Sequence, residues 1–319
     1  MADSAARLAY DAFLKEWNDD NDYIVANTSG STGSPKPIRL PKTDMWRSAM
    51  STVESMNLHQ TSIIASALPA RSIATKMAIV RSIAAGCSYL PVEPSNTPVI
   101  DRHIDLLSVA PSQTDALVAN TQYAQLIGTL LVGGAPLSGE REQALLNAGY
   151  NVYETYGMTE TCSNVALRHC PEPHFIANRG ISFTTDCRNC LRISAPEYSF
   201  DEIVTNDIVD LLSPHSFKWK GRYDNVINSG GIKLYPEEIE AMLQDFIKIP
   251  FYVVGIPDPR WGTAAAVVIE GTDADADIIK NILNDFSDHI RRPKKIIAVN
   301  TFRHTATGKI IREIPKTTE

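Results

Sequence analysis

Between residues 28 and 37 the chain reads Thr28-Ser29-Gly30-Ser31-Thr32-Gly33-Ser34-Pro35-Lys36-Pro37, shortly after the β-like stretch 23–26. Glycines let backbone N–H groups approach an anion closely, hydroxyls donate further hydrogen bonds, and the lysine adds positive charge. The run differs from a Walker A loop, in which the lysine directly follows the second glycine and a helix begins; Pro35 and Pro37 disfavour that helix. Two interpretations remain open, a polyphosphate-binding loop and a flexible loop of small polar residues.

The bulk composition indicates a globular enzyme of more than one domain. A length of 319 residues predicts two or three domains, and 44% hydrophobic with 21% charged residues is ordinary for globular proteins. The net charge of −7 argues against nucleic acid as the main partner, because nucleic-acid surfaces are basic. We find neither a secretory leader pattern nor an apolar run of membrane-spanning length, so we expect a cytoplasmic protein without membrane insertion.

The five cysteines do not form a disulfide framework. Cys187 and Cys190 are spaced as half a zinc site or a redox pair, but no second C-x-x-C follows. Reduced thiols are the favoured interpretation, and a metal site is left open.

Short apolar runs alternate with helix-like stretches over the first half of the chain. We expect strands at 62–67, 88–92, 116–119, 128–133 and 151–156, and helices at 2–21, 43–58, 74–85 and 139–148. Thr43 is the expected N-cap of the second helix. Such interleaving predicts a mainly parallel sheet with helices on both faces, and ligands of such sheets bind beyond the carboxyl ends of the strands.

The second half changes character. Residues 170–199 are predicted to be irregular, and a strand at 202–204 ends in Thr205-Asn206-Asp207. The charged stretch 220–224 is expected to be a strand-free linker. Beyond it, a helix starting at Pro236, strands at 251–254, 264–269 and 295–299, and a helix at 275–291 predict a compact α+β domain. The expected domains are therefore residues 1–221 and 222–319.

Four further segments carry groups suited to a nucleotide. Residues 153–161 place aromatics, hydroxyls and a carboxylate around Gly157, which suits purine stacking and Mg²⁺ bound to phosphates. Asp207 is a natural acceptor for ribose hydroxyls. The glycine-containing run 221–231 precedes the helix at Pro236, and Lys309 lies on a turn near the C-terminus. Each segment alone has a structural explanation, such as packing, a turn or a solvated side chain, but all of them together in this order are improbable by chance.

Together these motifs, from about residue 24 to residue 312, resemble the adenylate-forming superfamily of acyl-CoA synthetases, amino-acid-adenylating domains and luciferases. The resemblance implies an α/β fold: a large N-terminal domain with mainly parallel sheets flanked by helices, and a small mobile C-terminal α+β lid domain. It also implies ATP, Mg²⁺, CoA and a small carboxylic acid as ligands, and an activity that forms an acyl-adenylate and then a thioester.

The resemblance also implies roles for residues at matching positions. The ATP-binding residues would be Thr28, Ser29, Gly30, Ser31, Thr32, Gly33, Lys36, Gly133, Gly134, Ala135, Glu154, Thr155, Tyr156, Gly157, Asp207 and Arg222. Tyr156 would stack on the adenine, and Asp207 with Arg222 would bind the ribose. Lys309, Thr159 and Glu160 would be catalytic, with Glu160 also holding the metal. The hinge would be Asp224, and the CoA channel would be lined by Ser229, Gly230, Gly231 and Lys233.

Within the superfamily, the segments 68–81, 217–222 and 229–236 look most like the o-succinylbenzoate–CoA ligases of menaquinone biosynthesis. By that resemblance Arg81 would pair with the ring carboxylate of the acid, and Ser72 stands where many acyl-CoA ligases carry a histidine. Only residues 1–27 precede the glycine-rich loop, fewer than is usual in the family. We therefore expect a short N-terminal part, and whether a homodimer covers the exposed sheet surface is left open.

Three alternatives stay open at this point: another aryl- or acyl-CoA ligase, an adenylation enzyme that loads a carrier protein, and a non-catalytic nucleotide-binding remnant. Basic residues in the 70–81 segment disfavour recognition of an α-amine. The retention of Glu160, Asp207 and Lys309 disfavours the remnant.

Overall fold

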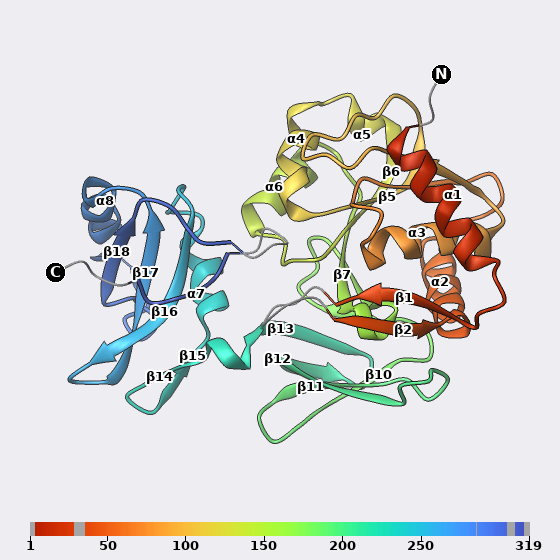
Figure 1. The fold of residues 1–319 in the computed structure, drawn as a ribbon. Coiled ribbons are helices and arrows are strands. Elements are labelled where there is room, and N and C mark those ends of the chain that lie inside the picture. The colour runs from red at the N-terminus through yellow and green to blue at the C-terminus, as the bar shows by residue number, and fades with distance from the viewer. Residues whose placement is uncertain (1–3, 29–35, 285, 305–309, 316–319) are drawn as a thin grey trace. The chain divides into compact units, whose positions relative to one another are not determined.

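The computed structural model describes residues 4–28, 36–284, 286–304 and 310–315 (Figure 1). The chain divides into two compact units. The first comprises Met1–Thr184, Ile193–Ile203 and Leu212–Phe217, and the second comprises Thr185–Arg192, Val204–Leu211 and Lys218–Glu319.

Helices and strands alternate through most of the first unit. Its helices are α1 (Ala5–Trp17), α2 (Lys42–Ser55), α3 (Ile73–Ala85), α4 (Thr114–Ala119), α5 (Tyr123–Leu126) and α6 (Gly139–Asn147), with 3₁₀ turns at Pro111–Gln113 and Thr159–Thr161. Its strands are β1 (Tyr23–Asn27), β2 (Pro37–Pro41), β3 (Ile63–Ser66), β4 (Ser88–Pro91), β5 (Ile104–Val109), β6 (Ile127–Val132), β7 (Val152–Met158), β8 (Ser163–His169) and β9 (Phe175–Ala177).

Four strands follow before the C-terminal α+β part. They are β10 (Ser182–Thr185), β11 (Cys190–Ser194), β12 (Glu202–Ser213) and β13 (Ser216–Arg222), and a 3₁₀ turn at Tyr223–Asn225 comes next. The remaining elements are β14 (Ile227–Ser229), β15 (Ile232–Leu234), α7 (Pro236–Leu243), β16 (Phe251–Asp258), β17 (Gly262–Glu270), α8 (Asp273–Asn284) and β18 (Lys295–Val299).

One large mixed sheet organises the chain. Among the described residues its strand order is β10-β11-β12-β13-β9-β8-β7-β6-β5-β3-β4. The pairs β4–β3, β3–β5, β5–β6 and β6–β7 are parallel, whereas β7–β8, β8–β9 and β9–β13 are antiparallel. The parallel part confirms the α/β class expected from the alternation of strands and helices.

Helices cover both faces of the parallel strands. On one face Leu107 and Leu130 pack in a buried cluster with Leu117 of α4 and Leu145 of α6. On the other face Ile64, Leu106 and Leu131 pack with Ala78 of α3. Because each central strand buries both of its faces, the sequence shows short apolar runs rather than strict alternation.

The C-terminal elements form their own small core. Strand β17 pairs antiparallel with β16 and parallel with β18, and β14 and β15 form a separate hairpin. Ile239 and Leu243 of α7 and Ile279 and Leu283 of α8 pack against Val253 and Val267 of the sheet. This arrangement is the small α+β domain that the sequence predicts.

Two elements near the parallel strands differ from expectation. The stretch 116–119, expected to be a strand, lies in helix α4, and the central strand β5 was not anticipated. A four-residue apolar run cannot by itself distinguish a strand from a buried helical turn. Thr43 is not an N-cap, because β2 runs directly into α2 and Pro41 occupies the cap position without a side-chain hydrogen bond.

The region after β8 is more ordered than expected. Strands β9, β10 and β11 occupy much of the stretch 170–199, and β13 ends at Arg222, inside the segment 220–224 that was expected to be strand-free. Strand β12 continues to Ser213, so Asp207 lies inside it rather than at its end. Short antiparallel strands rich in polar residues give too weak a periodic signal to be recognised from sequence.

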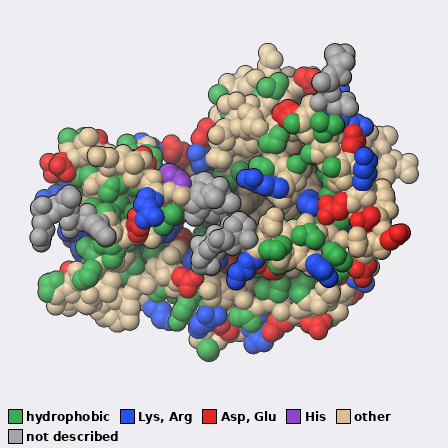
Figure 2. Space-filling view, viewed as in Figure 1, with side chains coloured by type: hydrophobic (Ala, Val, Ile, Leu, Met, Phe, Trp, Pro, Cys, Tyr) green, Lys and Arg blue, Asp and Glu red, His purple; other side chains and the backbone are tan. Residues whose placement is uncertain are grey.

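The surface carries charges of both signs. On the face shown in Figure 2, Lys and Arg side chains are interspersed with Asp and Glu, and the described residues there form no continuous basic surface. In the described part of the chain, no helix has the length and apolar character needed to cross a membrane.

Candidate active site

The ends of the glycine-rich loop are held together by two hydrogen bonds. The backbone N–H of Thr28 donates to the carbonyl of Lys36 at 2.9 Å, and the N–H of Lys36 donates to the Thr28 hydroxyl at 3.1 Å. Strands β1 and β2 pair on either side of these residues, so no helix follows the loop, as its prolines predict. The loop therefore joins two paired strands. The candidates Ser29, Gly30, Ser31, Thr32 and Gly33 lie outside the described residues.

The turn after β7 holds two further candidates, Thr159 and Glu160. The Thr159 hydroxyl is 3.5 Å from the carbonyl of Asn27, next to the start of the loop. The Thr161 hydroxyl accepts from the N–H of Met158 and donates to the carbonyl of Ser163, which fixes the turn. Glu160 is exposed and lies on this hydrogen-bonded turn.

The backbone beyond this turn is strained. Cys162 and Ser163 both have positive φ, 53° and 83°, a conformation that non-glycine residues rarely adopt. The Ser48 hydroxyl donates to the Cys162 carbonyl at 2.9 Å and helps to hold this conformation. Residues held in such conformations cluster at functional sites.

Gly157 is required by the close approach of β7 and β8. A Cβ at this position would lie 1.9 Å from the backbone oxygen of Ser163, and the strand register shifts between Tyr156 and Gly157. Nothing larger than hydrogen fits against a fixed backbone atom at that distance.

We expect Gly157→Ala to lower the free energy of unfolding by about 3 kcal/mol, measured by urea denaturation. Gly149→Ala is a suitable control, because Gly149 has φ +88° but open space in the Cβ direction. The free energy of unfolding of the control should fall by only about 1 kcal/mol, because of backbone strain. Equal losses for the two variants would contradict the steric explanation.

Gly133 follows β6 at the carboxyl edge of the sheet. A Cβ there would lie 2.2 Å from the Thr155 hydroxyl, so the Gly133 backbone and Thr155 are in close contact. Gly134 has φ +87° with open space around it, and Ala135 follows. The structure therefore brings these predicted adenine-pocket residues together at one edge.

Glu154 is engaged in a buried ion-pair network. Its carboxylate accepts from the backbone N–H of Leu137 at 2.9 Å and from Arg168 Nε at 2.8 Å, and Arg168 also pairs with Glu142. Burial raises the pKa of Glu154, while the neighbouring Arg168 acts to lower it. In this structure the side chain fastens the segment after Gly134 to β7, and direct contact with a nucleotide remains a prediction.

Tyr156 is braced by other aromatic rings. Its ring centroid lies 5.0 Å from that of Phe217, at an interplanar angle of 76°, and 5.8 Å from that of Phe175. Edge-to-face packing of this kind fixes the orientation of the ring. The predicted stacking of Tyr156 on adenine is compatible with such a fixed ring.

In the second unit, Asp207 and Arg222 lie side by side on β12 and β13. The buried Asp207 carboxylate accepts from Arg222 Nη1 at 3.3 Å and from Trp219 Nε1 at 3.4 Å. Asp224 accepts from Asn206 Nδ2 at 3.2 Å and lies 3.7 Å from Arg222 Nη2. The predicted ribose-binding pair and the predicted hinge residue therefore form one continuous polar cluster.

The segment predicted to line a CoA channel is the β14–β15 hairpin. Gly230 and Gly231 both have positive φ, 58° and 84°, as a tight two-residue hairpin turn requires. The N–H of Gly230 donates to the carbonyl of Trp261, and a Cβ at Gly230 would meet the Trp261 ring at 2.6 Å. Ser229 and Lys233 lie on the two strands of this hairpin.

Lys309 lies outside the described residues, but both ends of its segment are anchored. His304 and Ile310 form an antiparallel bridge, and the N–H of Ile311 donates to the carbonyl of Arg303 at 2.8 Å. Arg312 forms a two-pronged ion pair with Glu240 of α7, at 2.5 and 2.7 Å. The described residues that flank the Lys309 segment are thus held within the small domain.

Arg81 of α3 is a buried charged residue of the first unit. Its side chain is 1% exposed and donates from Nη2 to Asn164 Oδ1, while Nε has no hydrogen-bond partner. Among the described residues no carboxylate forms an ion pair with it, and burial lowers its pKa to about 10. At neutral pH Arg81 is therefore a buried positive charge without a carboxylate partner among the described residues.

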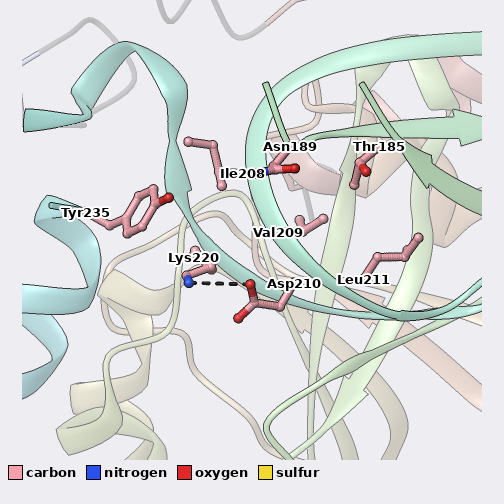
Figure 3. A pocket seen from close by; sticks show the side chains of 8 residues that line it. All are labelled: Thr185, Asn189, Ile208, Val209, Asp210, Leu211, Lys220 and Tyr235. Atoms are coloured by element: carbon pink, nitrogen blue, oxygen red, sulfur yellow. Dashed lines mark ion pairs between the residues drawn. The ribbon is translucent and has the colours of Figure 1, made fainter. Parts of the chain in front are cut away.

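A cavity of about 340 Å³ in the second unit was not anticipated from the sequence (Figure 3). Its lining residues are Thr185, Asn189, Ile208, Val209, Asp210, Leu211, Lys220 and Tyr235. Lys220 Nζ lies 3.4 Å from both Asp210 and Glu238, so its charge is already compensated. None of the predicted site residues lines this cavity.

Within the described ranges no group of three or more His, Cys, Asp or Glu side chains could hold a metal ion. Cys187 is exposed and Cys190 is buried, both as free thiols.

The chain is similar in sequence to known enzymes. The chain is similar to the 2-succinylbenzoate–CoA ligase of Enterococcus faecalis, at 26% identity over 328 residues, covering 90% of this chain and 68% of that protein. It is equally similar to the enzyme of the same name from Listeria monocytogenes, at 26% identity over 94% of this chain and 70% of that protein.

The fold of the chain is also similar to solved structures of enzymes of this kind. An acyl-CoA synthetase (AMP-forming)/AMP-acid ligase II-like protein from Dyadobacter fermentans matches with a TM-score of 0.65 at 29% identity, over 97% of this chain and 93% of that one. The o-succinylbenzoate coenzyme A synthetase of Bacillus subtilis, solved with ATP and a magnesium ion, matches with a TM-score of 0.74 over 90% of this chain and 68% of that one. At 19% identity the second likeness shows a shared fold.

Family models match both parts of the chain. Residues 251–309 match the C-terminal domain of AMP-binding enzymes, and residues 3–185, more than half of the chain, match the AMP-binding enzyme model itself. The resemblance drawn from the motifs is confirmed, and the chain belongs to the family of AMP-binding, adenylate-forming enzymes.

Proposed function

We propose that this protein is an AMP-forming acid–CoA ligase that converts 2-succinylbenzoate (o-succinylbenzoate), CoA and ATP to 2-succinylbenzoyl-CoA, AMP and pyrophosphate. The family supports the reaction class, and the curated relatives named above support this acid as the substrate.

The burial of the Arg81 charge is the structural observation that favours this acid as the substrate. A guanidinium removed from water without an anion costs several kcal/mol, roughly, even after relaxation. A substrate with a second carboxylate would supply the missing anion and recover part of that cost through charge-assisted hydrogen bonds. 2-Succinylbenzoate has such a group on its ring, while its succinyl carboxylate stays available for activation.

In the first step, the succinyl carboxylate attacks the α-phosphorus of ATP and pyrophosphate leaves. Negative charge gathers at a pentacoordinate phosphorus, so groups that place positive charge there lower the barrier. We assign the loop from Thr28 to Lys36 to the leaving phosphates, Thr159 to the α-phosphate, and Lys309 to the developing charge. Asp207 and Arg222 would hold the ribose, and Tyr156 the adenine.

The donor set beside the loop suits Mg²⁺. The exposed carboxylate of Glu160 is a hard oxygen ligand, and Mg²⁺ is usually held by one or two carboxylates together with substrate phosphates and water. When bound, the ion supplies positive charge at the phosphate oxygens. Glu160 would position it from the rigid turn after β7.

In the second step, the CoA thiolate attacks the carbonyl carbon of the acyl-adenylate and AMP leaves. We propose that residues 222–319 act as a lid on residues 1–221, with Asp224 as the hinge, and that rotation of the lid withdraws Lys309 from the phosphates. Ser229, Gly230, Gly231 and Lys233 would then line the channel for the thiol-bearing arm of CoA. The cytoplasmic location expected from the sequence stays a prediction, and the homodimer stays an open alternative.

A screen of pyrophosphate release tests the proposal. With ATP and Mg²⁺ present, 2-succinylbenzoate should give the fastest release when compared with benzoate, short fatty acids and amino acids. Arg81→Ala should remove the response to 2-succinylbenzoate selectively. Faster release with an amino acid would favour a carrier-loading enzyme, and no release with any acid would overturn the proposal.

A further inference from the structure

Arg81 belongs to a chain of buried hydrogen bonds that joins three elements. Arg81 Nη2 donates to Asn164 Oδ1 on β8, Asn164 Nδ2 donates to the Thr52 hydroxyl at 3.2 Å, and Thr52 donates to the Ser48 carbonyl at 3.1 Å on α2. Asn164 is 2% exposed and Thr52 is fully buried.

This chain fixes which end of the Asn164 side chain faces the arginine. The Thr52 hydroxyl already donates its hydrogen to Ser48, so it can only accept from Asn164. The NH₂ group therefore faces Thr52, and the carbonyl oxygen faces Arg81. Asn164 thus orients the guanidinium through a dipole that carries no net charge.

The position of Asn164 links Arg81 to the nucleotide site. Asn164 directly follows Cys162 and Ser163, the two left-handed residues after the turn of Thr159 and Glu160. Its backbone carbonyl accepts from Asn178 Nδ2 at 2.9 Å, so the main chain is held as well. Movement of the side chain away from Arg81 is therefore restricted.

The neutrality of residue 164 decides what Arg81 can bind. An aspartate has the same shape and would accept from Arg81 at the same place, but it would cancel the buried charge. We propose that Asn164 is a specificity-determining residue, which orients Arg81 and leaves its charge available for the second carboxylate of the acid substrate. This inference rests on the proposed function.

Asn164→Asp tests the inference with two acids that differ in one group. 2-Succinylbenzoate carries the ring carboxylate, and 4-oxo-4-phenylbutanoate has the same succinyl chain without it. We expect kcat/KM for 2-succinylbenzoate to fall about 100-fold, because an internal carboxylate now occupies Arg81. The value for 4-oxo-4-phenylbutanoate should stay within about threefold of that of the unmodified protein.

The thermal midpoint gives a readout independent of turnover. Asn164→Asp should raise it, because the buried cation gains an internal partner. Asn96→Asp is the matched control, since Asn96 is exposed and the change in net charge is the same. The control should alter neither the midpoint nor the preference between the two acids.

The ratio of the two kcat/KM values is taken on one preparation, so it does not depend on the fraction of folded protein. Should Asn164→Asp fail to fold, Asn164→Ala gives the second test. In that variant kcat/KM for 2-succinylbenzoate should fall about tenfold, while kcat/KM for 4-oxo-4-phenylbutanoate should be unchanged. An unchanged ratio in an active Asn164→Asp protein would overturn the inference and leave the proposed function intact. Failure of the unmodified protein to activate 2-succinylbenzoate would instead overturn the proposed function.

Discussion

Lys309→Ala is expected to slow formation of the acyl-adenylate by about 100- to 1,000-fold, the range seen when a group that stabilises transition-state charge is removed. The lysine ammonium would lie where negative charge gathers on the α-phosphate, and no water molecule can supply an equivalent fixed charge. The described residues on both sides of its segment are paired, and Arg312 is fastened to Glu240.

The same variant should leave the second step largely intact. Thioester formation from synthetic 2-succinylbenzoyl-adenylate and CoA involves no new charge at phosphorus, so it does not need the lysine there. The two half-reactions are measured separately, by ATP–pyrophosphate exchange and by release of AMP from the synthetic adenylate. Lys280→Ala, at an exposed position of α8, is the control. Equal loss of both half-reactions would refute the role assigned to Lys309.

Arg81→Met has the second large expected effect. We expect kcat/KM for 2-succinylbenzoate to fall at least about 100-fold, because truncation of one partner of a buried charge pair costs roughly 2–5 kcal/mol. Folding stability should change little. Removal of a buried, unpaired charge is favourable, whereas the Asn164 carbonyl oxygen loses its donor at a cost of about 1–3 kcal/mol.

A large loss of kcat/KM with little change in stability distinguishes a substrate-binding arginine from a structural one. Thermal unfolding and steady-state kinetics are measured on the same preparation, with Arg102→Met as the control at an exposed arginine of the first unit. A structural arginine would show the opposite pattern, with lower stability and no change in the preference between acids.

The glycine- and hydroxyl-rich motifs could be predicted from the sequence because their chemistry is local. Thr28 and Lys36 close one loop, Thr159 and Glu160 share one turn, and Asp207 meets Arg222 on neighbouring strands. The loop and the turn each lie within a short stretch, so residue types and spacing sufficed to single them out, whereas Arg222 was singled out only through the family resemblance.

Contacts between distant segments could not be found in this way. Asn164 and Arg81 are 83 positions apart, and no local pattern links them. The partner of Glu154 was missed for a similar reason, because Arg168 reaches it only across the pairing of β7 and β8. Strand β5 was missed and helix α4 was taken for a strand, because tertiary packing, rather than local propensity, decides the structure of short apolar runs.

The fate of a labelled oxygen atom tests the central claim most directly. The succinyl carboxylate of 2-succinylbenzoate is labelled with ¹⁸O and incubated with the protein, ATP, Mg²⁺ and CoA, and the nucleotide product is examined by mass spectrometry. Attack of that carboxylate on the α-phosphorus predicts AMP that carries one ¹⁸O atom. The appearance of ADP, or of AMP without the label, would contradict the account.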